Sequence, residues 1–146
     1  MTNIQAHQTS GPSIISQQAA VGALNGDQSS VESLRLTLEN NRKVMMEQLN
    51  SLTGVKVTKP DGTFYCFADF NAYEKDSSKL ALFLLKKVYV VTVPGVAFGL
   101  DGFLRLSTCG SIKEIIKGIE RIKWALDPGA TGDLVVGDRK LVKDWS

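Results

Sequence analysis

Long apolar runs and cysteine are both scarce in this sequence of 146 residues. No stretch approaches the roughly 20 consecutive apolar residues that a membrane-spanning helix requires. The first residues contain no basic patch followed by an apolar run, which would mark a signal peptide. Two cysteines, Cys66 and Cys109, are too few for a disulfide scaffold. We therefore expect no membrane partner, a reducing environment and a cytoplasmic location.

An excess of one charge is missing as well. The sequence has 17 Lys and Arg against 15 Asp and Glu, a formal net charge of +2, and the two signs interleave along the predicted helices. A nucleic-acid-binding domain instead gathers basic residues on one face, so we expect no nucleic-acid partner. Cysteine and histidine with the spacing of zinc ligands are also lacking, and we expect no metal site.

The residues that are present suffice for one ordinary domain. Hydrophobic residues make up 43% of the chain, which is enough for a core. A proline in Gly11–Ser13 predicts the start of a first helix. Ser29 and Glu32 have the spacing of a capping box, and the residues after them predict a long helix from Ser30 to Thr53. This helix would be about 36 Å long, which favours a connector between two parts of a larger molecule.

The next segments alternate between strand and helix patterns. Val55–Lys59 and Thr63–Phe67 are separated by turn residues and predict a hairpin. Lys79–Lys87 has the apolar spacing of a helix. Tyr89–Val93 is a β-branched run, and Phe103–Ser107 is a short strand with an arginine at its centre. The region therefore predicts about four strands and one intervening helix.

The last predicted helix has the clearest signal. Ser111 and Glu114 form a second capping box. The apolar residues after it recur at helical spacing and predict a face buried against the sheet. This stripe consists of Ile112, Ile115, Ile116, Ile119, Ile122 and Leu126.

Together these elements predict an α+β fold with two layers. We expect a small mixed sheet of about four strands packed by helices, because the helix at Lys79–Lys87 allows a crossover connection. Residues 1–28 hold the first helix, residues 29–126 form the main domain, and residues 127–146 are a tail. The tail contains one possible hairpin, Leu134–Val136 against Lys140–Val142, or is loose.

Arg105 is the strongest candidate for a functional residue. Leu104 and Leu106 point to one face of the predicted strand, and Arg105 points to the other. A guanidinium within a short apolar strand is costly unless it is paired, and its flat fork matches a carboxylate. By itself, however, the pattern favours an arginine that faces water or an internal Asp or Glu.

Three weaker candidates have plainer alternatives. Phe64 and Tyr65 begin a strand and would form a ligand wall, although the pattern by itself favours core packing. The Pro94–Gly99 segment has glycines that permit close approach to a ligand, or it is an ordinary loop. Thr9 and Ser10 precede a helix and would contact an anion or cap that helix.

Several segments, taken in order, resemble the class I aminotransferases of the aspartate aminotransferase type. The segment from Thr9 to Ala20 is similar to the one that follows the family's catalytic-lysine region. The long helix resembles the connector between the large and small domains. The other matching segments, within a resemblance that runs from about Ile4 to Leu126, are Lys59–Tyr65, Val93–Gly99, Phe103–Ser107 and the isoleucine-rich helix. Each motif is moderately specific, but their shared order is strong evidence.

The resemblance implies a pyridoxal-phosphate-dependent transaminase that acts on an amino acid and a 2-oxo acid. Such enzymes hold the cofactor as a Schiff base on a lysine. That lysine belongs to a segment upstream of the part matched here. No lysine of this chain has such a context, so no catalytic residue is predicted and no covalently bound cofactor is expected. Cofactor-binding residues are not identified.

The resemblance also implies a role for the strand arginine. Arg105 would grip the substrate α-carboxylate, with Phe64 and Tyr65 beside the substrate. The chain would be the small domain with a large-domain remnant at residues 1–28. It would need a lysine-bearing N-terminal half, would be inactive alone, and would form a homo-oligomer such as a dimer. The alternative is a free-standing carboxylate-binding or protein-interaction domain that kept the fold and lost the chemistry.

Overall fold

A computed structural model describes residues 3–4, 7 and 11–145 of the chain. The chain divides into two compact units, with the boundary between Arg35 and Leu36. The boundary falls within helix α3 (Ser29–Asn50). Among the described residues, no helix is both long and apolar enough to cross a membrane.

The first unit contains α2 (Ile14–Asn25) and the beginning of α3. No residue of α2 is buried, and large apolar side chains such as Ile15 and Leu24 are 78% and 80% exposed. Ser29 is the first residue of α3 rather than its cap, and Asp27 accepts hydrogen bonds from its N–H and hydroxyl. Glu32 binds Arg35 instead of the helix start. The predicted capping box at Ser29 and Glu32 is therefore wrong.

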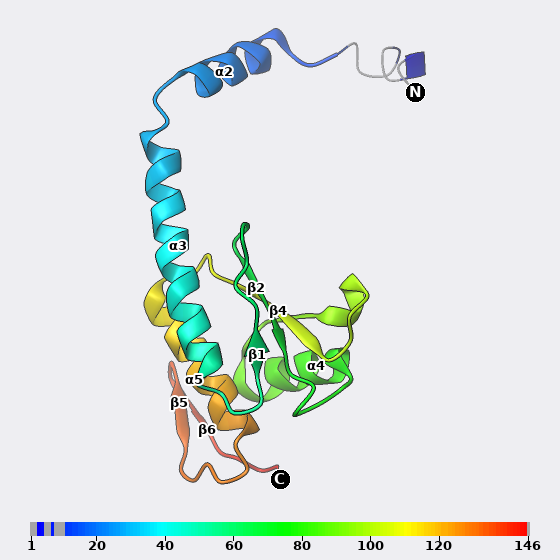
Figure 1. Ribbon diagram of the computed structural model, residues 1–146, viewed down its shortest axis with the longest axis vertical. Helices are drawn as coiled ribbons and strands as arrows, with labels where there is room; N and C mark the ends of the chain where they lie inside the picture. Colours follow the sequence, from blue (N-terminus) through cyan, green and yellow to red (C-terminus); the bar gives the residue numbers. More distant parts are fainter. Residues whose placement is uncertain (1–2, 5–6, 8–10, 146) are drawn as a thin grey trace. The chain divides into compact units, whose positions relative to one another are not determined.

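The second unit is built on a four-stranded sheet (Figure 1). The strand order is β1-β2-β4-β3, and every neighbouring pair is antiparallel. The predicted α+β class with two layers and four strands is confirmed. The expected mixture of parallel and antiparallel strands is wrong. The strands are β1 (Lys56–Val57), β2 (Tyr65–Asp69), β3 (Val93–Pro94) and β4 (Phe103–Ser107).

The place of β4 between the strands that the crossover connects explains why the sheet is antiparallel and not mixed. Helix α4 (Ser77–Val88) joins β2 to β3, so that these two strands run in the same direction. However, β4 lies between them and pairs with both in the antiparallel sense. Of the predicted strand Tyr89–Val93 only Val93 pairs, together with Pro94 beyond its expected end, because the chain before Val93 belongs to the end of α4 and an extended segment. β2 and β3 are therefore parallel to each other, but no hydrogen bonds join them directly.

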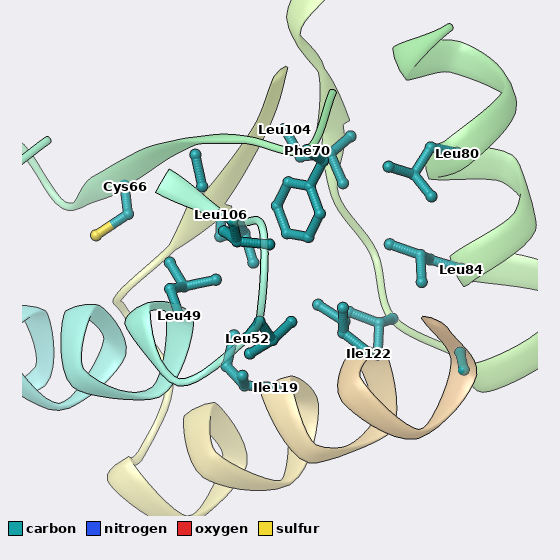
Figure 2. Packing of buried hydrophobic residues seen from close by; sticks show 14 of the residues in the cluster. Leu49, Leu52, Cys66, Phe70, Leu80, Leu84, Leu104, Leu106, Ile119 and Ile122 are labelled. Carbon is teal, nitrogen blue, oxygen red and sulfur yellow. The ribbon is translucent and has the colours of Figure 1, made fainter. Parts of the chain in front are cut away.

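Helices cover one face of the sheet and form the core with it. The inward positions of β2 and β4 are buried, while the residues between them are half-buried. Figure 2 shows these strand residues pointing toward side chains of α3, α4 and α5 (Ile112–Leu126). Burial of this apolar surface is the main stabilising contribution. The labelled core residues are Leu49, Leu52, Cys66, Phe70, Leu80, Leu84, Leu104, Leu106, Ile119 and Ile122.

Helix α5 follows its sequence pattern closely. Ser111 and Glu114 form the predicted capping box. Ile115, Ile119 and Ile122 are buried against the sheet. Ile112 is 38% exposed, so its predicted burial is wrong. It is the first residue of the helix, and its side chain lies outside the covered stretch.

The last residues form the hairpin that the sequence allowed. β5 (Leu134–Val136) pairs with β6 (Arg139–Leu141), so the second strand begins one residue earlier than expected. After the hairpin, Lys143 donates hydrogen bonds to carbonyl oxygens at the end of α5. Trp145 packs edge-on against Phe83 and Trp124. The tail is thus attached to the core helices.

Candidate functional site

Strand β4 presents Arg105 on the sheet face that the helices leave uncovered. Leu104 and Leu106 are buried toward the helices, and Arg105 between them is half-buried. Its Cα partners are Phe67 on β2 and Val93 on β3. Because side chains alternate along a strand, paired residues at these positions share one face. Arg105 therefore lies in the centre of the open face rather than at an edge of the sheet.

Aromatic rings surround the guanidinium. The Cζ atom of Arg105 lies 4.1 Å from the ring centroid of Tyr65 and 4.8 Å from that of Phe98. Phe67 stacks on Phe103 at 5.1 Å and meets Phe98 edge-on at 6.0 Å. Cation–π attraction to ring faces holds a guanidinium in place without using its N–H donors. These donors are left available to an acceptor.

The side chain of Arg105 lacks a hydrogen-bond or ion-pair partner within the described part of the chain. Its Nε atom is buried and unsatisfied. A buried donor without an acceptor costs free energy, and such atoms are rare in folded proteins. The described part of the chain therefore contains no Asp or Glu that pairs with Arg105, which the simpler interpretation requires. A planar fork in this position suits a carboxylate, which accepts two parallel hydrogen bonds.

The two aromatic candidates on β2 differ in their relation to Arg105. Tyr65 is part of β2 and stands directly beside the guanidinium. Phe64 precedes the strand, is 41% exposed, and touches Tyr65 with a centroid separation of 4.4 Å. Its carbonyl oxygen accepts a hydrogen bond from Thr108. Phe64 therefore lies one step further from the arginine than Tyr65. Thr9 and Ser10 lie outside the described residues.

The segment that carries Phe98 is a short 3-10 helix, η1 (Gly95–Phe98). It follows Pro94 and ends at Gly99, which has a positive φ of 78°. Gly95 is buried where the backbone returns toward β4. A Cβ atom at Gly95 would lie 2.2 Å from the carbonyl oxygen of Leu100 and 2.7 Å from that of Phe103. The tight contact requires glycine, because neither neighbour is a flexible side chain.

We expect Gly95→Ala to destabilise the chain by about 1–3 kcal/mol, the usual cost of overpacking. The free energy of unfolding from urea titration measures this loss. Gly62→Ala is the matched control, because a Cβ atom there meets nothing within 4 Å and φ is not positive. The control should change stability by less than about 0.5 kcal/mol. Equal stability of the two variants would show that η1 is not tightly packed.

Sequence reasoning missed Asn41 as a structural residue. Asn41 is buried on α3, and its side-chain amide donates to the carbonyl oxygens of Thr108 and Gly110, each at 2.9 Å. These residues follow β4, so the bonds attach the end of the arginine strand to α3. The available signal was the polar residue itself, which interrupts an apolar stripe between Leu38 and Met45. A side-chain amide that is buried and donates to two carbonyl oxygens takes the place of an apolar residue in such a stripe.

Sequence reasoning also missed the pair formed by Ser77 and Asp101. The Ser77 hydroxyl and N–H both donate to Oδ1 of Asp101, at 2.5 Å and 2.8 Å. Together with the N–H of Gly102, these donors hold the pKa of Asp101 below its usual range. The two residues are separated by 24 positions, and neither belongs to a motif. No local pattern would have found them.

The remaining candidate groups are less informative. Cys66 is buried, and burial raises the pKa of its thiol, which keeps it protonated and unreactive. Cys109 is exposed after β4. Within the described ranges, no three His, Cys, Asp or Glu side chains gather closely enough to hold a metal ion.

Comparison with known proteins gives consistent matches. The family model for aminotransferase class I and II matches residues 1–122. A probable aspartate/prephenate aminotransferase from Aquifex aeolicus is 39% identical over 132 residues, which cover 87% of this chain and 34% of that protein. The chain spans about a third of the length of the curated relatives it matches.

Solved structures match at a similar level. The aspartate aminotransferase from Rhizobium meliloti has a TM-score of 0.76 and 32% identity, covering 82% of this chain and 32% of that one. The aspartate aminotransferase from Thermus thermophilus, solved with maleate, has a TM-score of 0.75 and 31% identity. That match covers 83% of this chain and 32% of the other.

Proposed function

The chain belongs to the aminotransferase class I and II family, and we propose that it contributes the substrate-carboxylate site of a complete enzyme. That enzyme would transfer an amino group between an amino acid and a 2-oxo acid. One observation carries the proposal, namely the half-buried Arg105 whose Nε has no acceptor. The aromatic rings of Tyr65 and Phe98 support it, since they hold the guanidinium without consuming its donors.

In this role Arg105 binds and orients the substrate. Two parallel hydrogen bonds from the guanidinium fix both oxygens of a carboxylate and therefore the direction of the bond to the α-carbon. Tyr65 and Phe98 limit the rotation of the guanidinium and exclude water from its faces. Exclusion of water strengthens the charge-assisted bonds because the local dielectric constant is lower. Phe64 would extend the aromatic surface next to Tyr65.

The family depends on pyridoxal phosphate, which acts as an electron sink for the bond changes at the α-carbon. The open face of β4 suits a carboxylate better than this cofactor, because it offers one guanidinium and otherwise aromatic rings. We therefore assign none of these residues to the cofactor. The lysine and the other cofactor ligands would come from the rest of the enzyme.

The same proposal covers the partners and the division of the chain. Residues 29–126 would be the small domain of the enzyme, with residues 1–28 belonging to the large domain and residues 127–146 forming an additional tail. The exposed apolar side chains of α2, such as Ile15 and Leu24, support a contact with further protein surface. We propose that these side chains contact a lysine-bearing N-terminal part and a second copy of the enzyme. We propose that the complete enzyme is a homo-oligomer.

A second candidate function rests on the same arginine. A free-standing carboxylate-binding or protein-interaction domain would also use the unpartnered Nε of Arg105 and the exposed side chains of α2. Tight binding of a dicarboxylate by the chain alone, without any complementation by a lysine-bearing part, would favour this alternative.

The decisive experiment mixes the chain with the lysine-bearing N-terminal part of the Aquifex aeolicus relative. We expect cofactor absorbance and turnover of an amino acid with a 2-oxo acid in the mixture. The chain alone should show no turnover, and borohydride reduction should attach no cofactor to it. Arg105→Ala is the matched variant, which should keep the absorbance of the mixture and strongly lower its kcat/KM. Stoichiometric trapping of pyridoxal phosphate on one lysine of the chain alone would contradict the proposal.

A further inference from the structure

Ser77 at the start of α4 has an environment that helix capping does not explain. The cap of α4 is Asp76, whose side chain accepts the N–H of Lys79. Ser77 is instead completely buried, and its hydroxyl donates to Oδ1 of Asp101 at 2.5 Å. The same oxygen accepts the N–H of Ser77 at 2.8 Å and that of Gly102 at 3.0 Å. One carboxylate oxygen thus joins α4 to the turn that leads into β4.

The Ser77 hydroxyl also holds η1. It accepts a hydrogen bond from the N–H of Val96, the second residue of η1, at 3.2 Å. The end of η1 is closed by the bond from the N–H of Leu100 to the carbonyl oxygen of Gly95. Asp101 is the residue after this closure. Ser77 and Asp101 therefore restrain η1 from its beginning and from the turn that follows it.

Phe98 depends on these restraints for its position. Phe98 is 51% exposed, so burial alone does not fix its ring. The ring nevertheless lies 4.8 Å from the guanidinium carbon of Arg105 and edge-on to Phe67. A half-exposed ring keeps such contacts only when the backbone that carries it is held. The backbone of η1 is held at Val96 by the Ser77 hydroxyl, and Asp101 in turn holds Ser77 and the turn that follows η1.

We propose that Ser77 and Asp101 are positioning residues, which place Phe98 against Arg105 and thereby orient the guanidinium for a carboxylate. This inference rests on the proposed function of Arg105. Ser77 and Asp101 act through η1 and touch no substrate. The low pKa of Asp101 is consistent with this role, because it keeps the shared acceptor oxygen charged at neutral pH.

The test observes the Arg105 Nε–H signal in ¹⁵N-correlated NMR spectra of the full chain without ligand. Phe98→Leu removes one ring and gives the reference displacement of this signal. Ser77→Ala and Asp101→Asn should displace it in the same direction and by most of that amount. Asp76→Ala is the matched control, since it removes the cap of α4 but none of the bonds to η1. The control should leave the signal unmoved.

A titration with maleate then measures the effect on carboxylate binding. Dissociation constants of the Ser77→Ala and Asp101→Asn variants should rise by about 10-fold, within the penalty for a misplaced binding group. Arg105→Ala should abolish binding. An unchanged Arg105 signal in both variants, or an equal displacement in Asp76→Ala, overturns the positioning role. If Ser77→Ala does not fold, the surface variant Asp101→Asn decides the matter alone.

The two proposals fail in different ways. If maleate leaves the Arg105 signal of the unchanged chain unaffected, the carboxylate role is contradicted, whatever the variants do. If maleate binds to Arg105 but the variants bind it as tightly as the unchanged chain does, the carboxylate role stands and the positioning role is overturned.

Discussion

Arg105→Ala is expected to lower kcat/KM of the complemented enzyme by about 30- to 5,000-fold, which corresponds to about 2–5 kcal/mol for removal of one partner of a desolvated charge pair. Arg105→Lys should lower kcat/KM by a smaller factor, on the order of tenfold or more. Lysine keeps the positive charge but offers a compact ammonium instead of a flat fork. It would therefore attract the carboxylate without fixing both oxygens. Initial rates at varied amino-acid concentration measure the effect.

Two controls separate this loss from general damage. The absorbance of the bound cofactor should be unchanged in both Arg105 variants, because the cofactor ligands lie elsewhere. Arg121→Lys alters an arginine that donates to the carbonyl oxygens of Val88 and Tyr89 and should keep full turnover. A lysine variant at position 105 with unchanged kcat/KM would contradict bidentate binding and return the arginine to a purely structural role.

Replacing Ile119 by alanine is expected to lower the free energy of unfolding by about 2–5 kcal/mol, the range for large-to-small changes in a core. Ile119 is 3% exposed and lies on α5 between Ile115 and Ile122, opposite the sheet. Figure 2 shows its side chain within the cluster of buried hydrophobic residues. Truncation removes apolar burial and leaves a cavity that neighbouring helices do not close. Urea unfolding followed by circular dichroism gives the difference.

The control uses Ile112, whose burial was wrongly expected. Ile112→Ala shortens a side chain that is 38% exposed in the first turn of the same helix. We expect it to cost less than about 1 kcal/mol, because little apolar surface returns to water. Comparable losses at the two positions would mean that α5 does not pack on the sheet through this stripe.

Local patterns predicted the elements that carry their own signals. The strand Phe103–Ser107 has the observed bounds, because one face of β4 is buried and its residues alternate accordingly. The start of α5 was also predictable, since Ser111 and Glu114 satisfy each other's backbone donors within one turn. The alternation of side chains along this strand also placed Arg105 on the face opposite to Leu104 and Leu106.

Features that depend on distant segments were not predictable. The place of β4 between β2 and β3 follows from packing, and no turn motif encodes it. Likewise, Phe98 looked like part of a plain loop, although it lies over the guanidinium. The contact between Asn41 and Thr108 joins residues 67 positions apart. In each case the sequence marks the residue type but not its partner, since a single sequence holds no information on which distant residues pair.

The attachment of the tail has a consequence for optical measurements on this protein. The sequence contains two tryptophans, and both lie in the contact between the tail and the core helices, Trp124 on α5 and Trp145 in the tail. Their ring centroids are 5.5 Å apart, and Lys87 lies 4.8 Å from the Trp145 ring. Intrinsic tryptophan emission therefore reports the docking of the last residues on the core helices. A fluorescence-monitored transition that precedes the circular-dichroism transition measures undocking of the tail, with the sheet still folded.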